Sequence, residues 1–209
     1  MSDVEDRLAR IADELRGFAA TGLHFTRDPY DRERYLRIRD HAAELLALVD
    51  TRSADQLCQV FHEDVEARTP IVCVDGAIFD DDGRVLLVQR ADSGQWCLPG
   101  GASDVGEPPS AGAEREVREE TGLEVRATRV IGVYDNLSWG LPSVATHAYY
   151  LVFECERVGG TLTISHETTD FRWVGEADLP SVALFRGHRW KVPAALRMYG
   201  RPDVLPPFH

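Results

Sequence analysis

The stretch from residue 100 to 123, GGASDVGEPPSAGAEREVREETGL, constrains the fold of this chain more than any other. We expect a helix over 109–121 that ends at Gly122, because glycine readily adopts the left-handed conformation that follows a helix. At 100° per residue, Glu116, Glu119 and Glu120 then lie on one helix face. Three carboxylates on one face repel one another, so this face needs a compensating positive charge.

A divalent metal ion would supply that charge. Mg²⁺ takes oxygen ligands and is bound by carboxylates together with substrate phosphates. Arg115 stands four positions before Glu119 and is placed to hold that carboxylate. The alternative is an ordinary surface helix laced with salt bridges, which the segment EREVREE taken alone favours.

The first 62 residues carry helical patterns. One apolar seam, with spacings of four and three, consists of Val4, Leu8, Ile11, Leu15 and Phe18. We expect TGLHFTRDPYDRERY (21–35) to break this helix, with Asp28 as N-cap and Pro29 as first residue of the next one. A third helix is expected after Ser53, which with Gln56 forms a capping-box pattern. The narrow seams predict packing either in a homodimer or against the chain's own second domain.

The pattern changes near residue 69 to short β-rich runs. IVCVDGAIF and RVLLVQR are separated by a DDDG turn, and three further strand-like runs follow the glutamate-rich helix. GHRWKVPAALRMYG is expected to be a last helix. This order predicts an α/β layered domain. We divide the chain into an N-terminal helical extension (1–66), a catalytic domain (67–200) and an irregular tail (201–209).

Composition limits the function classes. A net charge of −12 argues against a protein that binds nucleic acid through phosphate contacts. No apolar run reaches the roughly 20 residues of a membrane span, and the N-terminus lacks the apolar core of a secretion signal. The four cysteines are scattered, which indicates free thiols and a cytoplasmic protein rather than disulfides or a zinc site.

The spacing around the glutamates identifies a known motif. Gly101 is followed after five residues by Glu107 and after seven more by Arg115. The complete pattern is GX5EX7REUXEEXGU, where U is aliphatic, and the chain matches it at every fixed position. In this it resembles the Nudix hydrolases, over roughly residues 69 to 185. A motif of this length is specific, and the preceding WCLPGG is similar to the strand and turn that lead into it in that family.

The resemblance implies a fold, a reaction and a site. Nudix hydrolases are α/β/α sandwiches around a mixed sheet that cleave a diphosphate within a nucleoside diphosphate linked to another group, with Mg²⁺ or Mn²⁺. By position, the implied metal ligands are Glu116, Glu119, Glu120, the carbonyl of Gly100, and Glu107 through water or as a loop support. Arg115 would orient a glutamate.

Three further assignments rest on reaction chemistry. A carboxylate has to take the proton of the attacking water, and the candidates are Glu116 or Glu120 and, on a later loop, Glu167. The alternatives for Glu167 are a late metal ligand or an ordinary loop glutamate. Arg90, at a strand end before the motif, is a candidate phosphate contact or a plain surface arginine. Trp139 would stack on a nucleobase or be an ordinary loop aromatic.

A second resemblance concerns the N-terminal half. TGLHFTRDPYDRERY followed by a helix is similar to the extension of a Nudix subgroup that acts on nucleoside diphosphates linked to X, such as CDP-choline or ADP-ribose, and forms homodimers. Ala102 departs from the aromatic residue common there. We therefore expect a nucleoside-diphosphate-X pyrophosphatase that releases NMP and phospho-X. The alternatives are a nucleoside triphosphate pyrophosphohydrolase and a non-catalytic nucleotide-sensing module.

Overall fold

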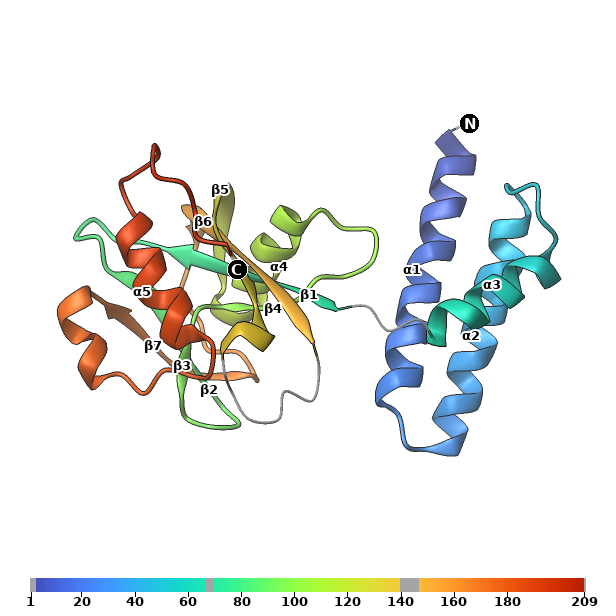
Figure 1. Cartoon of the computed structure of the whole chain (residues 1–209), viewed down its shortest axis with the longest axis horizontal. Helices are drawn as coiled ribbons and strands as arrows, with labels where there is room; N and C mark the ends of the chain where they lie inside the picture. Colours follow the sequence, from blue (N-terminus) through green and yellow to red (C-terminus); the bar gives the residue numbers. More distant parts are fainter. Residues whose placement is uncertain (1–2, 67–69, 140–146, 209) are drawn as a thin grey trace. The chain divides into compact units, whose positions relative to one another are not determined.

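The computed structural model describes residues 3–66, 70–139 and 147–208, with side chains described over 4–62, 70–137 and 147–208. The chain forms two compact units, one made of Met1–Thr69 with Asp104–Glu107 and the other of Pro70–Ser103 with Pro108–His209. Figure 1 shows helices alone in the first unit and strands with helices in the second. Within the described residues, no helix combines the length and apolarity that crossing a membrane requires.

The N-terminal unit consists of three helices, α1 (Asp3–Phe25), α2 (Pro29–Ala47) and α3 (Ala54–Glu66). Asp28 caps α2, because its carboxylate accepts the amides of Tyr30 and Asp31 at 2.8 and 3.0 Å. The Ser53–Gln56 capping box is also formed, with bonds of 2.9 and 3.3 Å. Both helix starts were correctly predicted from the sequence.

The predicted break at residues 21–35 is wrong in extent. Helix α1 continues through Gly22 to Phe25, and only three residues separate it from α2. A β-carbon on Gly22 would collide with the ring of Tyr35 on α2, so this glycine permits close helix packing instead of ending the helix. The small core of the unit is formed by Ala42, Ala43, Leu57 and Phe61.

The α/β unit contains two sheets. The strands are β1 (Ile71–Ile78), β2 (Val85–Arg90), β3 (Trp96–Cys97), β4 (Gly100–Ala102), β5 (Leu123–Asp135), β6 (Ala148–Gly160) and β7 (Thr168–Val174). One sheet has the order β4-β1-β6-β5 and the other β3-β2-β7. Strands β1 and β6 run parallel and the remaining pairs antiparallel, so the sheet is mixed as predicted. The helical parts are α4 (Pro109–Thr121), α5 (His188–Met198) and two 3₁₀ helices, η1 (Asn136–Trp139) and η2 (Glu176–Ser181).

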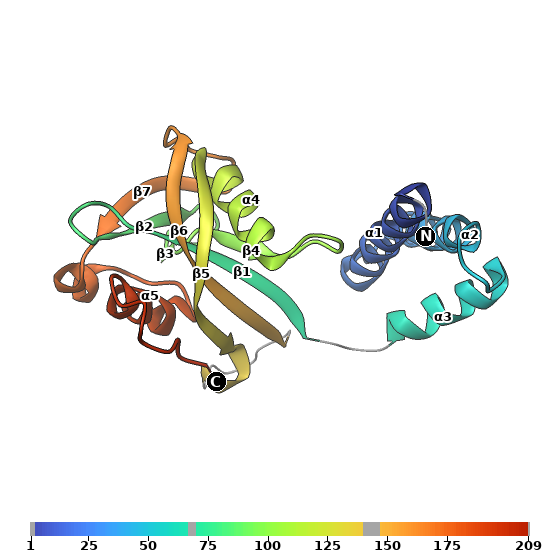
Figure 2. The same cartoon turned by 90° about the horizontal axis from the view of Figure 1, so that it is seen from above.

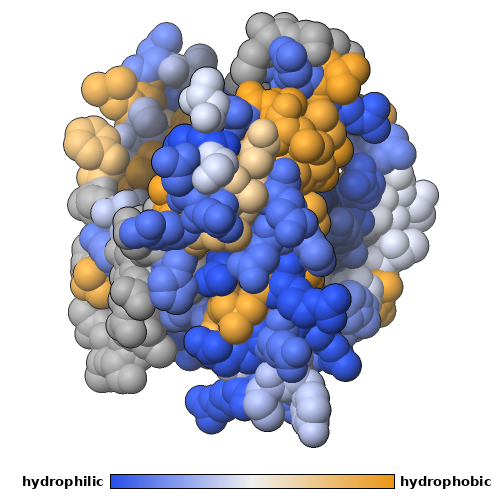
Figure 3. Space-filling view, turned by 90° about the vertical axis from the view of Figure 1, so that its right-hand side faces the viewer, coloured by the Kyte–Doolittle hydropathy of each residue, from blue (hydrophilic) through white to orange (hydrophobic). Residues whose placement is uncertain are grey.

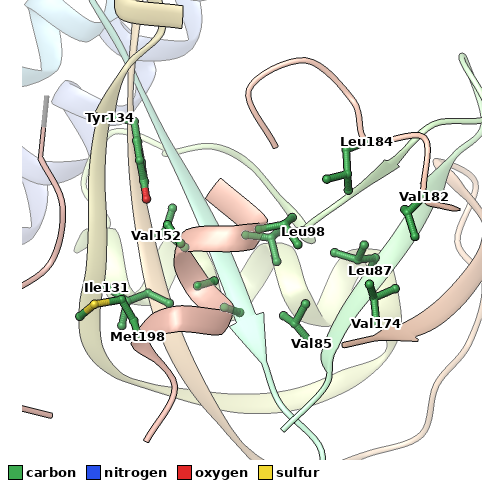
Figure 4. Close-up of a cluster of buried hydrophobic side chains, with 14 residues drawn as sticks. Val85, Leu87, Leu98, Ile131, Tyr134, Val152, Val174, Val182, Leu184 and Met198 are labelled. Atoms are coloured by element: carbon green, nitrogen blue, oxygen red, sulfur yellow. The ribbon is translucent and has the colours of Figure 1, made fainter. Parts of the chain in front are cut away.

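Two apolar cores lie on opposite sides of the strands, because successive side chains of a strand point to opposite faces. On one side, Val74 and Leu86 pack with Val117 of α4. On the other, Val85 and Leu87 pack with residues of α5, and Figure 4 shows this second core. Helices α4 and α5 therefore cover opposite faces, as Figure 2 shows, which is the predicted α/β/α sandwich.

Candidate active site

A cavity of about 350 Å³ opens beside the C-terminal half of α4. This volume is in the range of small-molecule sites. The lining residues are Arg90, Gly100, Gly101, Ala102, Glu116, Glu119, Glu120, Ser165, His166 and Glu167. Three segments that are distant in the sequence therefore meet here: the end of β2, the strand β4 with helix α4, and the loop before β7.

Helix α4 presents its carboxylates to this cavity because its opposite face is apolar. Ala113 and Val117 are fully buried against the sheet, whereas Glu116, Glu119 and Glu120 line the cavity. The helix begins at Pro109 and ends at Thr121, and Gly122 follows in the left-handed conformation with φ of 71°. These bounds and the shared glutamate face are those predicted from the sequence.

Arg115 holds two of the glutamates. Its guanidinium lies 2.7 Å from Glu116 and 3.2 Å from Glu119. It also donates to the carbonyl of Ala102 at 3.1 Å, which joins the helix to β4. Arg115 therefore fixes the helix carboxylates relative to the glycine strand.

The two glycines of β4 allow close approach of backbone and carboxylate. The amide of Gly100 donates to Glu120 Oε2 at 3.0 Å. A β-carbon on Gly101 would lie 2.7 Å from the carboxylate of Glu116, a distance that no real β-carbon tolerates. A side chain at 101 would therefore push Glu116 out of its place.

The electrostatics of the cavity disfavour negative charge. Burial, with the nearby carboxylates of Glu116 and Glu167, raises the pKa of Glu120 to about 8, against the opposing effect of the Gly100 amide. Burial also raises the pKa of Glu116, while Arg115 opposes this shift. Half-buried carboxylates with one shared arginine are a site where a cation is electrostatically favoured.

The chemistry of the candidate ligands fits a hard divalent cation, because they are carboxylate oxygens and a backbone carbonyl oxygen. Over the described residues, no three His, Cys, Asp or Glu side chains are grouped so as to hold a metal ion as they stand. Arg115 donates to Oε1 of Glu116, and the Gly100 amide donates to Oε2 of Glu120. The side chain of Glu119 is 55% exposed and that of Glu167 is 61% exposed, so both have room to turn inward.

The structure brings Glu167 and Arg90 to the same cavity. Glu167 follows the sharp turn at Ser165, whose hydroxyl accepts its amide at 3.1 Å. Arg90 pairs with Asp92 at 2.6 Å, and its guanidinium lies 4.4 Å from the ring centre of Phe185. Its head is therefore held at the cavity wall by a carboxylate and an aromatic face.

Of the remaining predicted site residues, one lies away from the cavity lining and the other has a side chain outside the described residues. Glu107 is not among the lining residues; its carboxylate accepts the amide of Asp104 at 2.8 Å and so supports the loop before α4. Trp139 is the last residue of η1, and its side chain lies outside the described residues.

Sequence reasoning passed over several polar residues near the site. Ser165 and His166 line the cavity, although nothing in their local pattern distinguishes them from loop residues. Asp75, His188 and Lys191 form a buried polar cluster. The charged Asp75 within the apolar run IVCVDGAIF was the available signal for that cluster.

Comparison with known proteins agrees with this geometry. The model of the NUDIX domain matches residues 69–196, which is more than half of the chain. The chain belongs to the Nudix hydrolase family. A second model, described as the UDP-X-like N-terminal oligomerisation domain, matches residues 6–61 of this Nudix hydrolase.

The individual relatives cover between 68% and 98% of the Nudix hydrolase. A Bacillus subtilis protein named "Putative ADP-ribose pyrophosphatase" is 28% identical over 183 residues, or 88% of each chain. A crystal structure of a UDP-X diphosphatase covers 98% of this chain and 99% of its own, with a TM-score of 0.63 and 24% identity, and so shows the shared fold. An ADP-ribose pyrophosphatase from Streptococcus suis is 28% identical, with a TM-score of 0.59, and covers 68% of this chain and 100% of its own.

Proposed function

We propose that this Nudix pyrophosphohydrolase hydrolyses, with Mg²⁺ or Mn²⁺, the diphosphate bond of a nucleoside diphosphate linked to X, and releases NMP and phospho-X. The observation that carries the proposal is the arrangement of four glutamates, Arg115 and two glycines around one small cavity. The match over 88% of the chain to a relative named for ADP-ribose, together with the UDP-X-like N-terminal match, supports X-linked diphosphates over triphosphates. ADP-ribose is the first substrate to test, and CDP-choline and UDP-linked compounds follow.

Gly100 and the charged residues of α4 have proposed roles. Glu116, Glu119 and Glu120, with the carbonyl of Gly100, would hold the metal; when bound, it neutralises phosphate charge and lowers the pKa of water. Arg115 keeps Glu116 and Glu119 oriented. Positioning and charge neutralisation, more than covalent chemistry, are what phosphoryl transfer asks of a protein.

Two residues outside α4 complete the proposed machinery. Glu167 faces the helix glutamates across the cavity and is more exposed, so it is the proposed base that takes the proton of the attacking water. Arg90 is the proposed contact to a non-bridging phosphate oxygen, because its guanidinium lines the cavity and is already restrained.

The N-terminal unit is proposed to form a homodimer. In α1 the exposed apolar residues recur every seven positions, at Val4, Ile11, Phe18 and Phe25, and they are 64%, 37%, 50% and 62% exposed. Leu15, from the other half of the predicted seam, packs inside the unit instead. Apolar patches lie among hydrophilic surface where Figure 3 views the N-terminal helices. A seven-residue apolar repeat is the spacing of helix-to-helix association.

The direct test is a substrate panel with ADP-ribose, CDP-choline, UDP-sugars and dNTPs, each with Mg²⁺, Mn²⁺ or EDTA, with products identified by mass. We expect metal-dependent release of an NMP from an X-linked diphosphate. Release of pyrophosphate from dNTPs alone would instead identify the protein as a nucleoside triphosphate pyrophosphohydrolase. A Glu167→Gln variant separates the proposed base from the metal ligands: it should lower kcat and flatten the pH profile without changing Mn²⁺ affinity.

The dimer has its own measurement. Light scattering should give twice the mass of the 23.3 kDa chain. The double variant Ile11→Glu/Phe18→Glu should instead have the mass of a single chain. A monomeric parent protein would refute the dimer without affecting the catalytic proposal.

A further inference from the structure

A buried polar cluster lies under the glycine strand, on the α5 side of the sheet. Asp75 of β1 and His188 and Lys191 of α5 are only 3%, 8% and 1% exposed. Lys191 Nζ is 2.7 Å from Asp75 Oδ2 and lies 4.1 Å from the ring centre of Tyr150. His188 Nε2 is 4.0 Å from Asp75 Oδ1. Charges buried this deeply carry a desolvation penalty that their pairing barely offsets, so the cluster is poorly explained by stability alone.

The cluster is bonded to the segment that enters the active site. His188 Nδ1 accepts the amide of Leu98 at 3.1 Å. Burial, aided by the positive charges of Lys191 and Arg90, lowers the pKa of His188 well below its usual value, so the ring is neutral. A neutral ring that accepts at Nδ1 carries its proton at Nε2, which faces Asp75. The Leu98 amide therefore fixes the tautomer of His188, and the protonated Nε2 lies 4.0 Å from Asp75 Oδ1.

The same segment is held on its other side by β1. The carbonyl of Pro99 accepts the amide of Gly76 at 2.9 Å, and Gly100 is the register partner of Asp75. The next bond leads to the catalytic helix, since the Gly100 amide donates to Glu120 at 3.0 Å. Contacts thus run without a gap from α5 through residues 98–100 to Glu120.

We propose that His188, buried beside the Asp75–Lys191 pair, is a positioning residue that fixes the Leu98–Gly100 segment so that Gly100 and Glu120 are set for the metal. This inference rests on the proposed function, in which Gly100 and Glu120 hold the cation. It assigns a role to α5, none of whose residues is among the described residues that line the cavity.

Two substitutions at one position separate the hydrogen bond from the bulk of the ring. Asparagine places an acceptor close to the position of Nδ1, whereas leucine fills similar space without one. His188→Leu should weaken Mn²⁺ binding, measured by calorimetry, by at least about tenfold, as is typical when a group that orients a ligand is lost. His188→Asn should stay within about threefold of the parent protein. In turnover, His188→Leu should lower kcat and raise the metal requirement while the substrate KM changes little.

A matched control tests whether any weakening of α5 has the same effect. Val192→Ala removes fully buried bulk from the same helix and touches no polar group of the cluster. It should lower the melting temperature and leave Mn²⁺ affinity unchanged. The inference is overturned if His188→Leu binds Mn²⁺ like the parent protein, or if Val192→Ala weakens binding equally.

Amide exchange in the metal-free protein provides a readout that is independent of turnover. In His188→Leu, exchange at both Leu98 and Gly100 should accelerate by about five- to tenfold, the factor expected for one lost bond. Acceleration at Leu98 alone would refute positioning of Gly100. If the parent protein hydrolysed no diphosphate or bound no Mn²⁺, the proposed function would fail, and this exchange pattern would still decide the role of His188.

Discussion

Replacing Glu120 with glutamine should abolish most activity and yet stabilise the metal-free protein. Glutamine keeps an oxygen that can accept the Gly100 amide, but it removes the charge. Loss of one such electrostatic contact in a preorganised site costs about 10²–10³ in kcat. Stability should rise because Glu120 sits where charge is disfavoured.

The size of the stabilisation follows from the pKa, which is about 8 in the folded protein against an ordinary value of 4.5. Above pH 4.5 the unfolded chain is ionised while the folded carboxyl keeps its proton, so the folded state loses stability as pH rises toward 8. At pH 7 this penalty is at most about 3 kcal/mol, and solvent screening of a half-buried group reduces it to about 1–2 kcal/mol. Glutamine avoids the penalty.

Thermal unfolding in EDTA at pH 4, 7 and 8 measures this effect. We expect the variant to melt about 2–8 °C higher at pH 7, higher still at pH 8 and at the same temperature as the parent protein at pH 4. Glu176→Gln, an exposed change in the same unit, should shift nothing. Equal melting temperatures of Glu120→Gln and the parent protein at pH 8 would refute the electrostatic argument, and equal turnover would refute the site assignment.

Three further outcomes are expected. Arg115→Ala should reduce kcat about 10- to 100-fold and raise the Mg²⁺ concentration for half-maximal rate, because two glutamates lose their orientation. Rates equal to those of the parent protein at every Mg²⁺ concentration would contradict this. Gly101→Ala should lower activity at least about tenfold with an unaltered circular dichroism spectrum, since its β-carbon displaces Glu116; a fully active variant would show that the carboxylate is free to move. Lys191→Met should destabilise the protein by about 3–5 kcal/mol by leaving Asp75 unpaired, and the double variant with Asp75→Asn should melt nearer the parent protein; identical losses in both would count against the pair.

Local chemistry was enough to predict helix α4 and its bounds. Pro109 at its start and Gly122 after its end act within one turn of the chain, and the 100° rotation per residue then places Glu116 and Glu120 on a common face. The caps at Asp28 and Ser53 are equally local. Alternating apolar runs were likewise enough to locate the strands and predict a layered α/β fold.

The tertiary structure decided which segments that are distant in the sequence contact one another. Gly22 has the residue type of a helix breaker, but packing against Tyr35 of the next helix keeps it helical. Glu114 belongs to the charged segment EREVREE, yet its carboxylate accepts the amide of Ala127 on a neighbouring strand at 2.9 Å. Local propensity is weak enough for such contacts to override it.

The candidate site shows the same division. Its carboxylates are readable from the sequence because their spacing on one helix is itself the signal. The residues that join them from other elements cannot be found in this way. Glu167 reaches the cavity from a loop 47 positions after Glu120. Asp75 pairs with Lys191, which lies 116 positions later in the sequence. The sequence shows the periodicity of apolar residues and the residues that cap helices. Contacts across the sheet arise only when the two cores have packed, because this packing fixes which loops face one another.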